Sequence, residues 1–460
     1  MKRIAVFCIP AHGHTNPMLP VLAELTRRGN QVRFYSFAEF RGKIEATGAA
    51  FIPCDRFLPE LNEQEAQALK NVSTTEMSIQ DIRITIAMTD FLQSEFDSFR
   101  PDVVYCDSAC FWGKLCAWKY GVPLVVSTST FAFNQMSSQY MKQTPQELAG
   151  LIFGLPRVQK EFKKLRDYGY PAKSFLSMVA SDNATDSVVY TSKRFQPFSE
   201  CFSDHYAFVG PSLFTDRQPD KPTPRPLVYI SMGTVINERP DFYARCIEAL
   251  RGLEVDVIIS CGRALDPAVL GELPENVQVF PYVDQLGVLA KTSVFITHCG
   301  MNSVSESLYM AAPAVLYPQT AEQQAVARRT EELGAGLRLT DDSADGIRAA
   351  VTAILQNPAY AQAAAECSRD FRSCSGAAGA ADFIEHAPHP SDGRDLVKEL
   401  NRAVTLEQIA YHVLAVIIGI VLFRFVSTRW LWLYIVAEVL LNAPIKKAFQ
   451  RMYYKKLTGM

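Results

Sequence analysis

The strongest constraint on this chain is residues 277–326, where a buried strand runs into a glycine turn and then into a helix. The apolar, β-branched run at residues 293–297 has the length of a buried strand. It is followed by His298 and a turn through Gly300, after which apolar residues recur at helical spacing. The first N–H groups of such a helix and its dipole attract an anion, and a glycine lets a ligand approach the backbone. The stretch therefore predicts an anion-binding turn.

Side chains suited to a larger ligand surround this turn in a fixed order. An aromatic residue and an amide precede it, a carboxylate lies on the following helix, and an acid–amide pair follows the next apolar strand, at residues 314–317. A π-face can stack on a base, and carboxylate and amide groups can bind hydroxyls. These residues are Tyr282, Gln285, Glu306, Glu322 and Gln323.

In this order the series resembles the signature of the UDP-glycosyltransferase family, nucleotide-sugar-dependent enzymes that glycosylate small molecules. The resemblance implies that Tyr282 stacks on uracil beside Gln285, and that Glu306 binds the ribose hydroxyls. It also implies that Glu322 and Gln323 bind the sugar. The diphosphate would lie against His298, Gly300, Asn302 and Ser303.

Two residues depart from the family pattern, and two have a structural alternative. Tyr282 replaces the usual Trp and Asp284 the usual Pro, which leaves the base and the sugar open. Asn302 and Ser303 are also common N-cap residues, so both can serve the helix alone.

Composition indicates a globular protein of two domains. The chain has 460 residues, 48% hydrophobic and 20% charged, which excludes general disorder. A net charge of −2 gives no support for nucleic-acid binding. No secretory signal is seen at the N-terminus, so a reducing cytoplasm is expected. The 11 cysteines lack paired metal-ligand spacing; Cys106, Cys110 and Cys116 come nearest, and buried free thiols are expected there rather than a metal site.

The N-terminal strand, residues 4–9, is followed by a loop with two histidines. No G-x-G-x-x-G follows this strand, which argues against a dehydrogenase. The loop instead carries Gly-His-x-Asn-Pro, which is similar to the N-terminal loop of the same family. By that resemblance His14 is the catalytic base. The alternative is a loop histidine with a structural hydrogen bond.

A carboxylate at the end of another expected strand, residues 101–107, is the predicted partner of this histidine. Asp107 at a strand's carboxyl end can hold one ring nitrogen of His14 protonated and leave the other as base. The family pattern has its orienting acid here. The alternative is that Asp107 only caps the helix that follows.

The remaining ligand contacts are predicted more loosely. Phe131, Phe133 and Met136 can form an apolar acceptor wall or belong to the core, and residues 143–181 are a candidate acceptor lid. The turn after the strand at residues 227–231 would contact the donor phosphates through Gly233 and Thr234, as the resemblance implies.

Repeated strand–loop–helix order predicts an α/β protein with parallel sheets covered on both faces. The resemblance, which spans residues 1–387, implies two Rossmann-like domains facing across a cleft, the glycosyltransferase B-type fold. We expect an acceptor domain at residues 1–215, a proline-rich linker at 216–226 and a donor domain at 227–390.

The C-terminal 58 residues, 403–460, change in character. Apolar runs at 409–423 and 430–443 flank a short basic break, and a basic end follows. Each run is shorter than the ~20 residues of an upright membrane span. A hairpin in one leaflet or two thin spans is expected, with the enzyme at the inner face of the membrane. The alternative is a helical pair that packs on the protein or on a second subunit.

These features predict inverting, metal-independent transfer of a hexose, with glucose favoured, from a UDP-sugar to a hydroxyl of an apolar small molecule or lipid. The UDP-sugar is a co-substrate, and no cofactor is expected. Two rivals are a nucleotide-sugar epimerase, which needs no acceptor, and a non-catalytic membrane-tethered nucleotide-sugar-binding protein.

Overall fold

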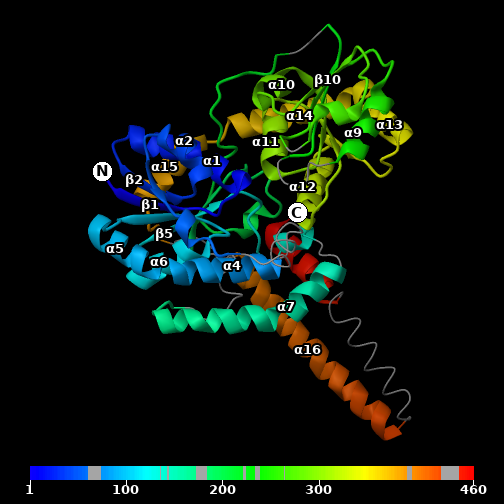
Figure 1. Cartoon of the computed structure of the whole chain (residues 1–460). Coiled ribbons are helices and arrows are strands. Elements are labelled where there is room, and N and C mark those ends of the chain that lie inside the picture. The colour runs from blue at the N-terminus through cyan, green and yellow to red at the C-terminus, as the bar shows by residue number, and fades with distance from the viewer. Residues whose placement is uncertain are drawn as a thin grey trace.

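Two parallel β-sheets, each covered by helices, make up the body of the molecule (Figure 1). The computed structural model describes residues 1–60, 74–134, 136–141, 145–171, 184–220, 224–233, 239–263, 265–390, 396–425 and 445–459. The expected α/β class with two doubly wound parallel sheets is confirmed.

The first sheet contains seven parallel strands and its centre holds the N-terminal strand. Their order is β3 (Ala50–Pro53), β2 (Gln31–Ser36), β1 (Arg3–Phe7), β4 (Val103–Asp107), β5 (Leu124–Thr128), β6 (Asp186–Val189) and β7 (Tyr206–Phe208). Strand β1 pairs with β2 on one side and with β4 on the other, so it is buried on both edges. Its run of fully buried residues explains the continuous apolar pattern in the sequence.

The second sheet has six parallel strands and repeats this plan. Their order is β10 (Val277–Phe280), β9 (Asp256–Ser260), β8 (Leu227–Ser231), β11 (Thr292–Thr297), β12 (Ala314–Leu316) and β13 (Gly336–Arg338). Here β11, the strand before the glycine turn, lies in the interior between β8 and β12.

Helices connect the strands and cover the sheets. In the first domain they are α1 (His12–Arg27), α2 (Arg41–Glu45), α4 (Thr74–Ala87), α5 (Thr89–Phe99), α6 (Phe111–Tyr120) and α7 (Pro145–Lys164). In the second domain they are α9 (Pro240–Leu250), α10 (Gln285–Lys291), α11 (Met301–Tyr309), α12 (Ala321–Glu332), α13 (Ala344–Gln356) and α14 (Pro358–Arg372).

One helix crosses back from the second domain to the first. Helix α15 (Gly376–His386) lies beside α1 and adds Ala380, Ala381 and Ile384 to the first domain's core (Figure 1). The expected boundary at residue 390 follows sequence order, whereas the packing of α15 is with the first sheet.

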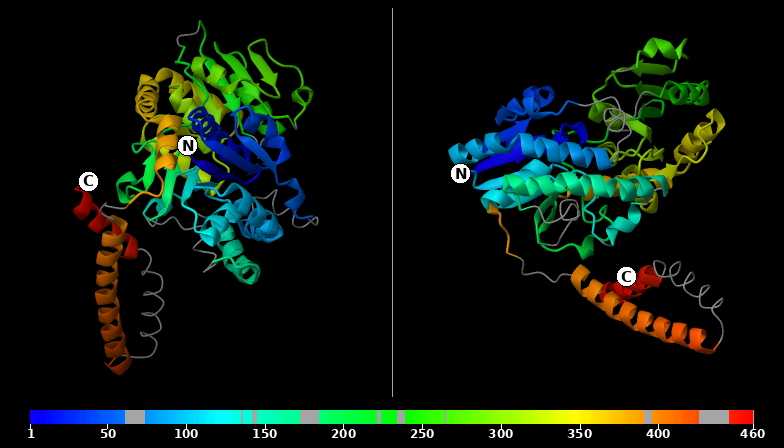
Figure 2. Two further views of the ribbon diagram at one scale, coloured as in Figure 1. Left: turned by 90° about the vertical axis from the view of Figure 1, so that its left-hand side faces the viewer. Right: turned by 60° about the horizontal axis from the view of Figure 1, so that its bottom comes forward.

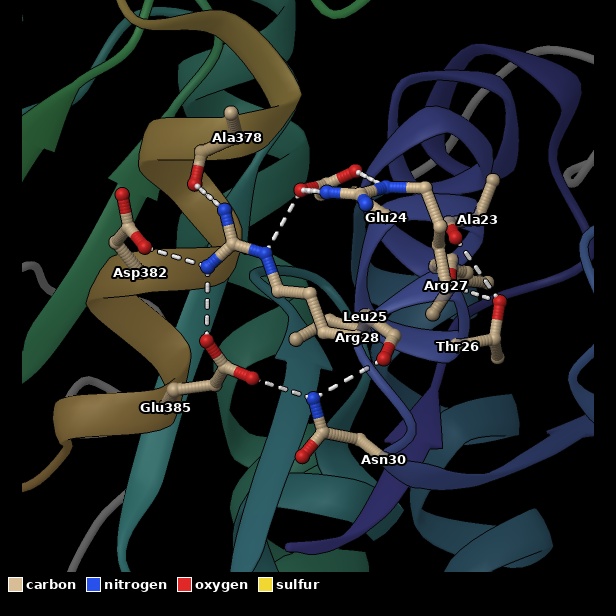
Figure 3. A network of polar contacts seen from close by, with 11 residues as sticks. Ala23, Glu24, Leu25, Thr26, Arg27, Arg28, Asn30, Ala378, Asp382 and Glu385 are labelled. Atoms are coloured by element: carbon tan, nitrogen blue, oxygen red, sulfur yellow. Dashed lines mark hydrogen bonds and ion pairs between the residues drawn. The ribbon is translucent and has the colours of Figure 1, made fainter. Parts of the chain in front are cut away.

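Arg28 at the end of α1 fixes this contact (Figure 3). Its Nε donates to Glu24 at 2.7 Å, and its Nη1 donates to Glu385 at 2.8 Å and also to Asp382. Its Nη2 donates to the carbonyl of Ala378 at 3.1 Å. A guanidinium matches this number of acceptors because its five N–H groups are held in one plane.

The C-terminal region contains the long helix α16 (Leu396–Phe425) and a shorter helix at residues 445–458. Helix α16 leaves the body of the molecule in both views of Figure 2. None of the helices in the described ranges is long and apolar enough to cross a membrane.

Several predictions fall outside the described residues. They are Thr234, the apolar run at 430–443, part of the basic break, 426–429, linker residues 221–223 and parts of the candidate lid, 143–144 and 172–181. Two short strands were not predicted from the sequence, β3 and β13.

Candidate active site

The strand pairing in the first sheet brings His14 and Asp107 together. His14 lies in the first turn of α1, which is separated from the end of β1 by four residues, 8–11. Strand β4 is the parallel neighbour of β1, with Cys106 opposite Phe7, so Asp107 ends β4 beside the loop that carries the histidine. Carboxyl ends of adjacent parallel strands share one edge of the sheet, where ligands bind in such folds.

The predicted pair is present as a hydrogen bond. Nδ1 of His14 lies 2.8 Å from Oδ1 of Asp107, whose side chain is fully buried. The second carboxylate oxygen, Oδ2, accepts the N–H of Ala109 at 3.2 Å. Helix α6 begins only at Phe111, with no side-chain cap. Asp107 therefore orders the loop before the helix and binds His14 at the same time.

A serine makes a second contact to the same ring nitrogen. Oγ of Ser129, the residue after β5, lies 3.1 Å from Nδ1 of His14. Because both contacts use Nδ1, Nε2 is the nitrogen that can receive a proton from a substrate.

Charges around His14 set its ionisation. Desolvation acts to lower the pKa of His14, but the charge and hydrogen bond of Asp107, with smaller contributions from Glu322 and Asp81, raise that pKa to about 9. Burial also raises the pKa of Glu322, which comes from α12 of the second domain. Three carboxylates from three elements therefore favour a proton on His14.

The glycine turn of the second domain lies against the His14 loop. Helix α11 begins at Met301 with Gly300 as N-cap and no side-chain cap, so the N-cap role considered for Asn302 and Ser303 is wrong. Nδ2 of Asn302 instead donates to the carbonyl of Gly13 at 2.9 Å, which joins the two domains next to the histidine. The predicted anion-binding turn and the predicted base are thus neighbours.

His298 is held between two glycines. A Cβ built on Gly233 or on Gly300 would lie 2.5 Å from atoms of its ring, closer than side chains pack. Gly233 also has φ +79°, a left-handed conformation that favours glycine. Burial lowers the pKa of His298 to about 4, so the ring is neutral at pH 7 and can donate one hydrogen bond.

The carboxylate predicted for the ribose belongs to a hydrogen-bonded chain. Nε2 of Gln285 donates to Oε2 of Glu306 at 2.7 Å, and the hydroxyl of Tyr229 donates to Oε1 of Gln285 at 3.0 Å. Burial raises the pKa of Glu306 to about 7. Gln285 therefore positions Glu306, and the two act as one unit.

The unusual Asp284 also has a local role. Its side chain accepts from the N–H of Gly287 and so caps α10, and it forms an ion pair with Arg217 of the linker. An aspartate in place of the family's proline thus fixes the start of the helix that carries Gln285.

Two other predicted donor contacts, Tyr282 and Gln323, differ in how far the protein itself engages them. Tyr282 is 73% exposed, which leaves its ring accessible to a base. The side-chain oxygen of Gln323 accepts the N–H groups of Gln319 and Thr320 in a capping box at the start of α12. If Gln323 binds the sugar as predicted, its amide nitrogen is therefore the atom that would make the contact.

Two of the three predicted acceptor residues are more buried than an open wall requires. Phe131 and Met136 are each 1% exposed, and Phe131 packs on Phe195 with ring centroids 5.5 Å apart. Phe133 is partly buried and packs on the same cluster. The burial of Phe131 and Met136 agrees with the core alternative, and acceptor contact by any of the three stays a prediction.

Sequence reasoning missed Ser129 and Asp81. Ser129 follows directly after β5, so the rule that ligands bind at the carboxyl ends of parallel strands would have found it. Asp81 lies within helix α4, and nothing in its local sequence indicates that it affects His14. In the part of the chain that the structure covers, no group of three or more His, Cys, Asp or Glu side chains could hold a metal ion.

Comparisons with known proteins find similarity along most of the chain. A family model described as "UDP-glucoronosyl and UDP-glucosyl transferase" matches residues 222–373. NDP-glycosyltransferase YjiC of Bacillus licheniformis is 34% identical over 393 residues, covering 84% of this chain and 97% of that protein. Demethyllactenocin mycarosyltransferase of Streptomyces fradiae is 30% identical over 407 residues, covering 85% and 87%.

Solved structures show the same architecture. The glycosyltransferase of kitacinnamycin superposes with a TM-score of 0.70 at 27% identity, covering 84% of this chain and 98% of its own. The calicheamicin glycosyltransferase CalG4 superposes with a TM-score of 0.63 at 26% identity, covering 85% and 100%.

Proposed function

This chain is a glycosyltransferase of the UDP-glucuronosyl and UDP-glucosyl transferase family, and on that premise we propose that it transfers a hexose from a UDP-sugar to a hydroxyl of an apolar acceptor. Nε2 of His14 takes the hydroxyl proton while the oxygen attacks the anomeric carbon. The bond from that carbon to the diphosphate breaks on the opposite face, UDP leaves, and the configuration inverts. Asp107 holds the ring and stabilises its charged form.

The donor would lie on the turn of the second domain. The first N–H groups of α11 and the neutral ring of His298 would donate hydrogen bonds to the leaving diphosphate and stabilise its developing charge. No metal ion is therefore needed in this proposal. Glu306 would bind the ribose, Tyr282 the base, and Glu322 with the amide nitrogen of Gln323 the sugar. Glucose is proposed as the sugar, since Gln323 suits it in this family.

One observation carries this proposal: the hydrogen-bonded pair of His14 and Asp107 is adjacent to the turn at Gly300 through the contact of Asn302 with Gly13. A base and a diphosphate site must lie on either side of one sugar for transfer to occur. An epimerase needs no base for an external acceptor, and the relatives named above are transferases.

A membrane is proposed as a further partner. The exposed apolar side chains of α16 support contact of the tail with lipid, which would place the enzyme at the cytoplasmic face of the membrane.

The reaction is tested with UDP-sugars and hydroxylated apolar acceptors on wild type, His14→Ala and His12→Ala. We expect His14→Ala to lower turnover by about 10²- to 10⁴-fold while UDP still binds. His12→Ala is the matched control, because His12 lies in the same first turn of α1 but faces Glu39, 3.8 Å away. A His14→Ala enzyme as active as wild type would remove the base assignment.

A further inference from the structure

The outer half of α16, residues 406–425, exposes many large apolar side chains. Between Glu407 and Arg424 the sequence contains no Asp, Glu, Lys or Arg. Eight apolar side chains from this part of the helix are each 40–62% exposed: Leu406, Ile409, Val413, Leu414, Val416, Ile417, Ile418 and Ile420. A soluble protein rarely leaves so continuous an apolar patch without a partner.

The exposed residues do not form a single stripe. At about 100° per residue, Val416, Val413 and Ile418 point in directions that together span more than half of the helix circumference. A protein partner covers one stripe of a helix, whereas hydrocarbon covers every side. The distribution therefore fits a lipid phase better than a second copy of this chain.

The helix at residues 445–458 supplies a complementary charge. Lys447, Arg451 and Lys455 recur at every fourth position and are exposed, and no acidic residue lies between residues 445 and 459. Basic side chains near anionic lipid each add favourable binding energy. The opposite side of this helix packs on the protein through Phe449 and Tyr453.

The inner half of α16 packs on the first domain. Leu400 and Val404 are each 1% exposed and belong to a cluster with Met136. Tyr453 donates to Glu407 at 2.6 Å, which joins the C-terminal helix to α16.

The cluster that anchors the tail lies in the chain segment that reaches the site. Met136 belongs to the segment after β5 that begins at Ser129, the contact of His14. The same segment ends near Tyr140, whose hydroxyl donates to Glu332 of the second domain at 2.5 Å. The tail thus packs on the segment that contacts His14 at one end and the second domain at the other.

From these observations we propose that α16 inserts its outer half into an anionic lipid surface without spanning it, and that the acceptor is an amphiphile resident in that surface. From Leu406 to Phe423, the last residue before Arg424, the helix rises about 26 Å, less than the ~30 Å of a hydrocarbon core. The proposal has two halves: insertion into lipid, the lipid half, and use of a lipid-resident acceptor, the acceptor half. The lipid half depends on the tail alone. The acceptor half rests on the proposed function and adds that the hydroxyl is presented to His14 from the lipid.

Flotation of the full chain with vesicles tests the lipid half. The probes are phosphatidylcholine vesicles with and without phosphatidylglycerol, and the variant is Val413→Glu with Ile417→Glu, two exposed residues one turn apart. We expect wild type to float with the anionic vesicles and the variant to lose about 10-fold or more of that binding. Phe214→Glu, at a residue 63% exposed on the body, is the matched control and should float like wild type.

Three results would overturn the lipid half. They are equal flotation of variant and wild type, no flotation of wild type, or a wild-type dimer that the same substitutions convert to monomers without any flotation. The third result would identify a second copy as the occupant.

Turnover with two acceptors tests the acceptor half. A diacylglycerol in vesicles is compared with a flavonol in solution, with UDP release as the measurement. We expect the tail variant to lose about 10-fold or more of its turnover on the vesicle-borne acceptor and none on the dissolved one. Wild type that floats and binds UDP but never uses the vesicle-borne acceptor would overturn this half. Failure to bind or turn over any UDP-sugar would instead contradict the proposed function and leave the flotation result standing.

Discussion

The two domains each place a histidine after a central strand, and the two rings have opposite acid–base character. His14 follows β1 and its pKa is raised to about 9, whereas His298 follows β11 and its pKa is lowered to about 4. Both are desolvated, so burial does not explain the difference. The neighbouring strand does: β4 ends in Asp107 beside His14, while β8 leads to Gly233 beside His298.

The comparison teaches that one local motif can give a base or a neutral hydrogen-bond donor. A carboxylate partner stabilises the imidazolium that forms when His14 takes a proton. A glycine partner adds no charge and leaves room for the ring of His298 against the backbone. The partner on the adjacent strand therefore decides which role the histidine can have.

The largest effect is expected from Asp107→Asn, which should make His14 resemble His298. Without the carboxylate, desolvation dominates and the pKa of His14 falls from about 9 to below its ordinary value. Only neutral His14 can act as base, so wild-type activity should rise with pH up to about 9. In the variant this dependence should move to acid pH while maximal turnover falls about 10²-fold or more.

A pH–rate profile of kcat checks this, with UDP affinity as the control. A variant that keeps the wild-type profile would show that Asp107 does not set the ionisation of His14.

The next effect tests the other histidine. In Gly300→Ala the new methyl would meet the ring of His298 at 2.5 Å, so the ring or the turn must move. We expect UDP affinity to fall about 10-fold or more, with the pH dependence of turnover unchanged. Calorimetric titration with UDP measures this. Gly42→Ala on α2, where an added Cβ meets nothing within 4 Å, is the control. Unchanged UDP affinity in Gly300→Ala would place the diphosphate elsewhere.

A smaller, separate pH effect is expected in the second domain. The pKa of Glu306 is raised to about 7, so its ionised form, the better acceptor for ribose hydroxyls, increases as the pH rises through 7. UDP affinity should therefore increase between about pH 6 and pH 8, below the range in which His14 titrates. Glu306→Gln should abolish this increase and lower affinity at pH 8 about 10-fold. If wild-type affinity is constant over this range, the ribose assignment is wrong.

The smallest effect concerns neither histidine. Arg28→Ala removes the contacts that attach α15 to α1 (Figure 3) and should lower the free energy of unfolding by about 1–2 kcal/mol. Turnover of the folded variant and both pH dependences should match wild type. Thermal and urea unfolding measure the loss, and Arg27→Ala on the more exposed side of α1 serves as control. A changed pH profile would mean that α15 influences the site through α1.

Much of the fold was readable from local sequence. The expected strands at residues 4–9, 101–107, 293–297 and 314–317 correspond to β1, β4, β11 and β12. The edge strand β3 was missed because its apolar run is short and ends in Pro53, and a proline lowers the expectation of a strand. The packing of α15 on the first sheet was missed because the pattern of a helix gives its apolar face but not which sheet that face covers.

The sequence by itself determined the two kinds of turn: a histidine loop after the first strand, and a glycine turn at the start of α11. Strand period and glycine chemistry are local properties, so they can be read along the chain. Only the tertiary structure decided which groups surround each turn. Asp107, Ser129, Asp81 and Glu322 reach His14 from four different elements. The order of strands in the sheets and the position of one domain against the other bring them there, and neither is encoded in any single segment.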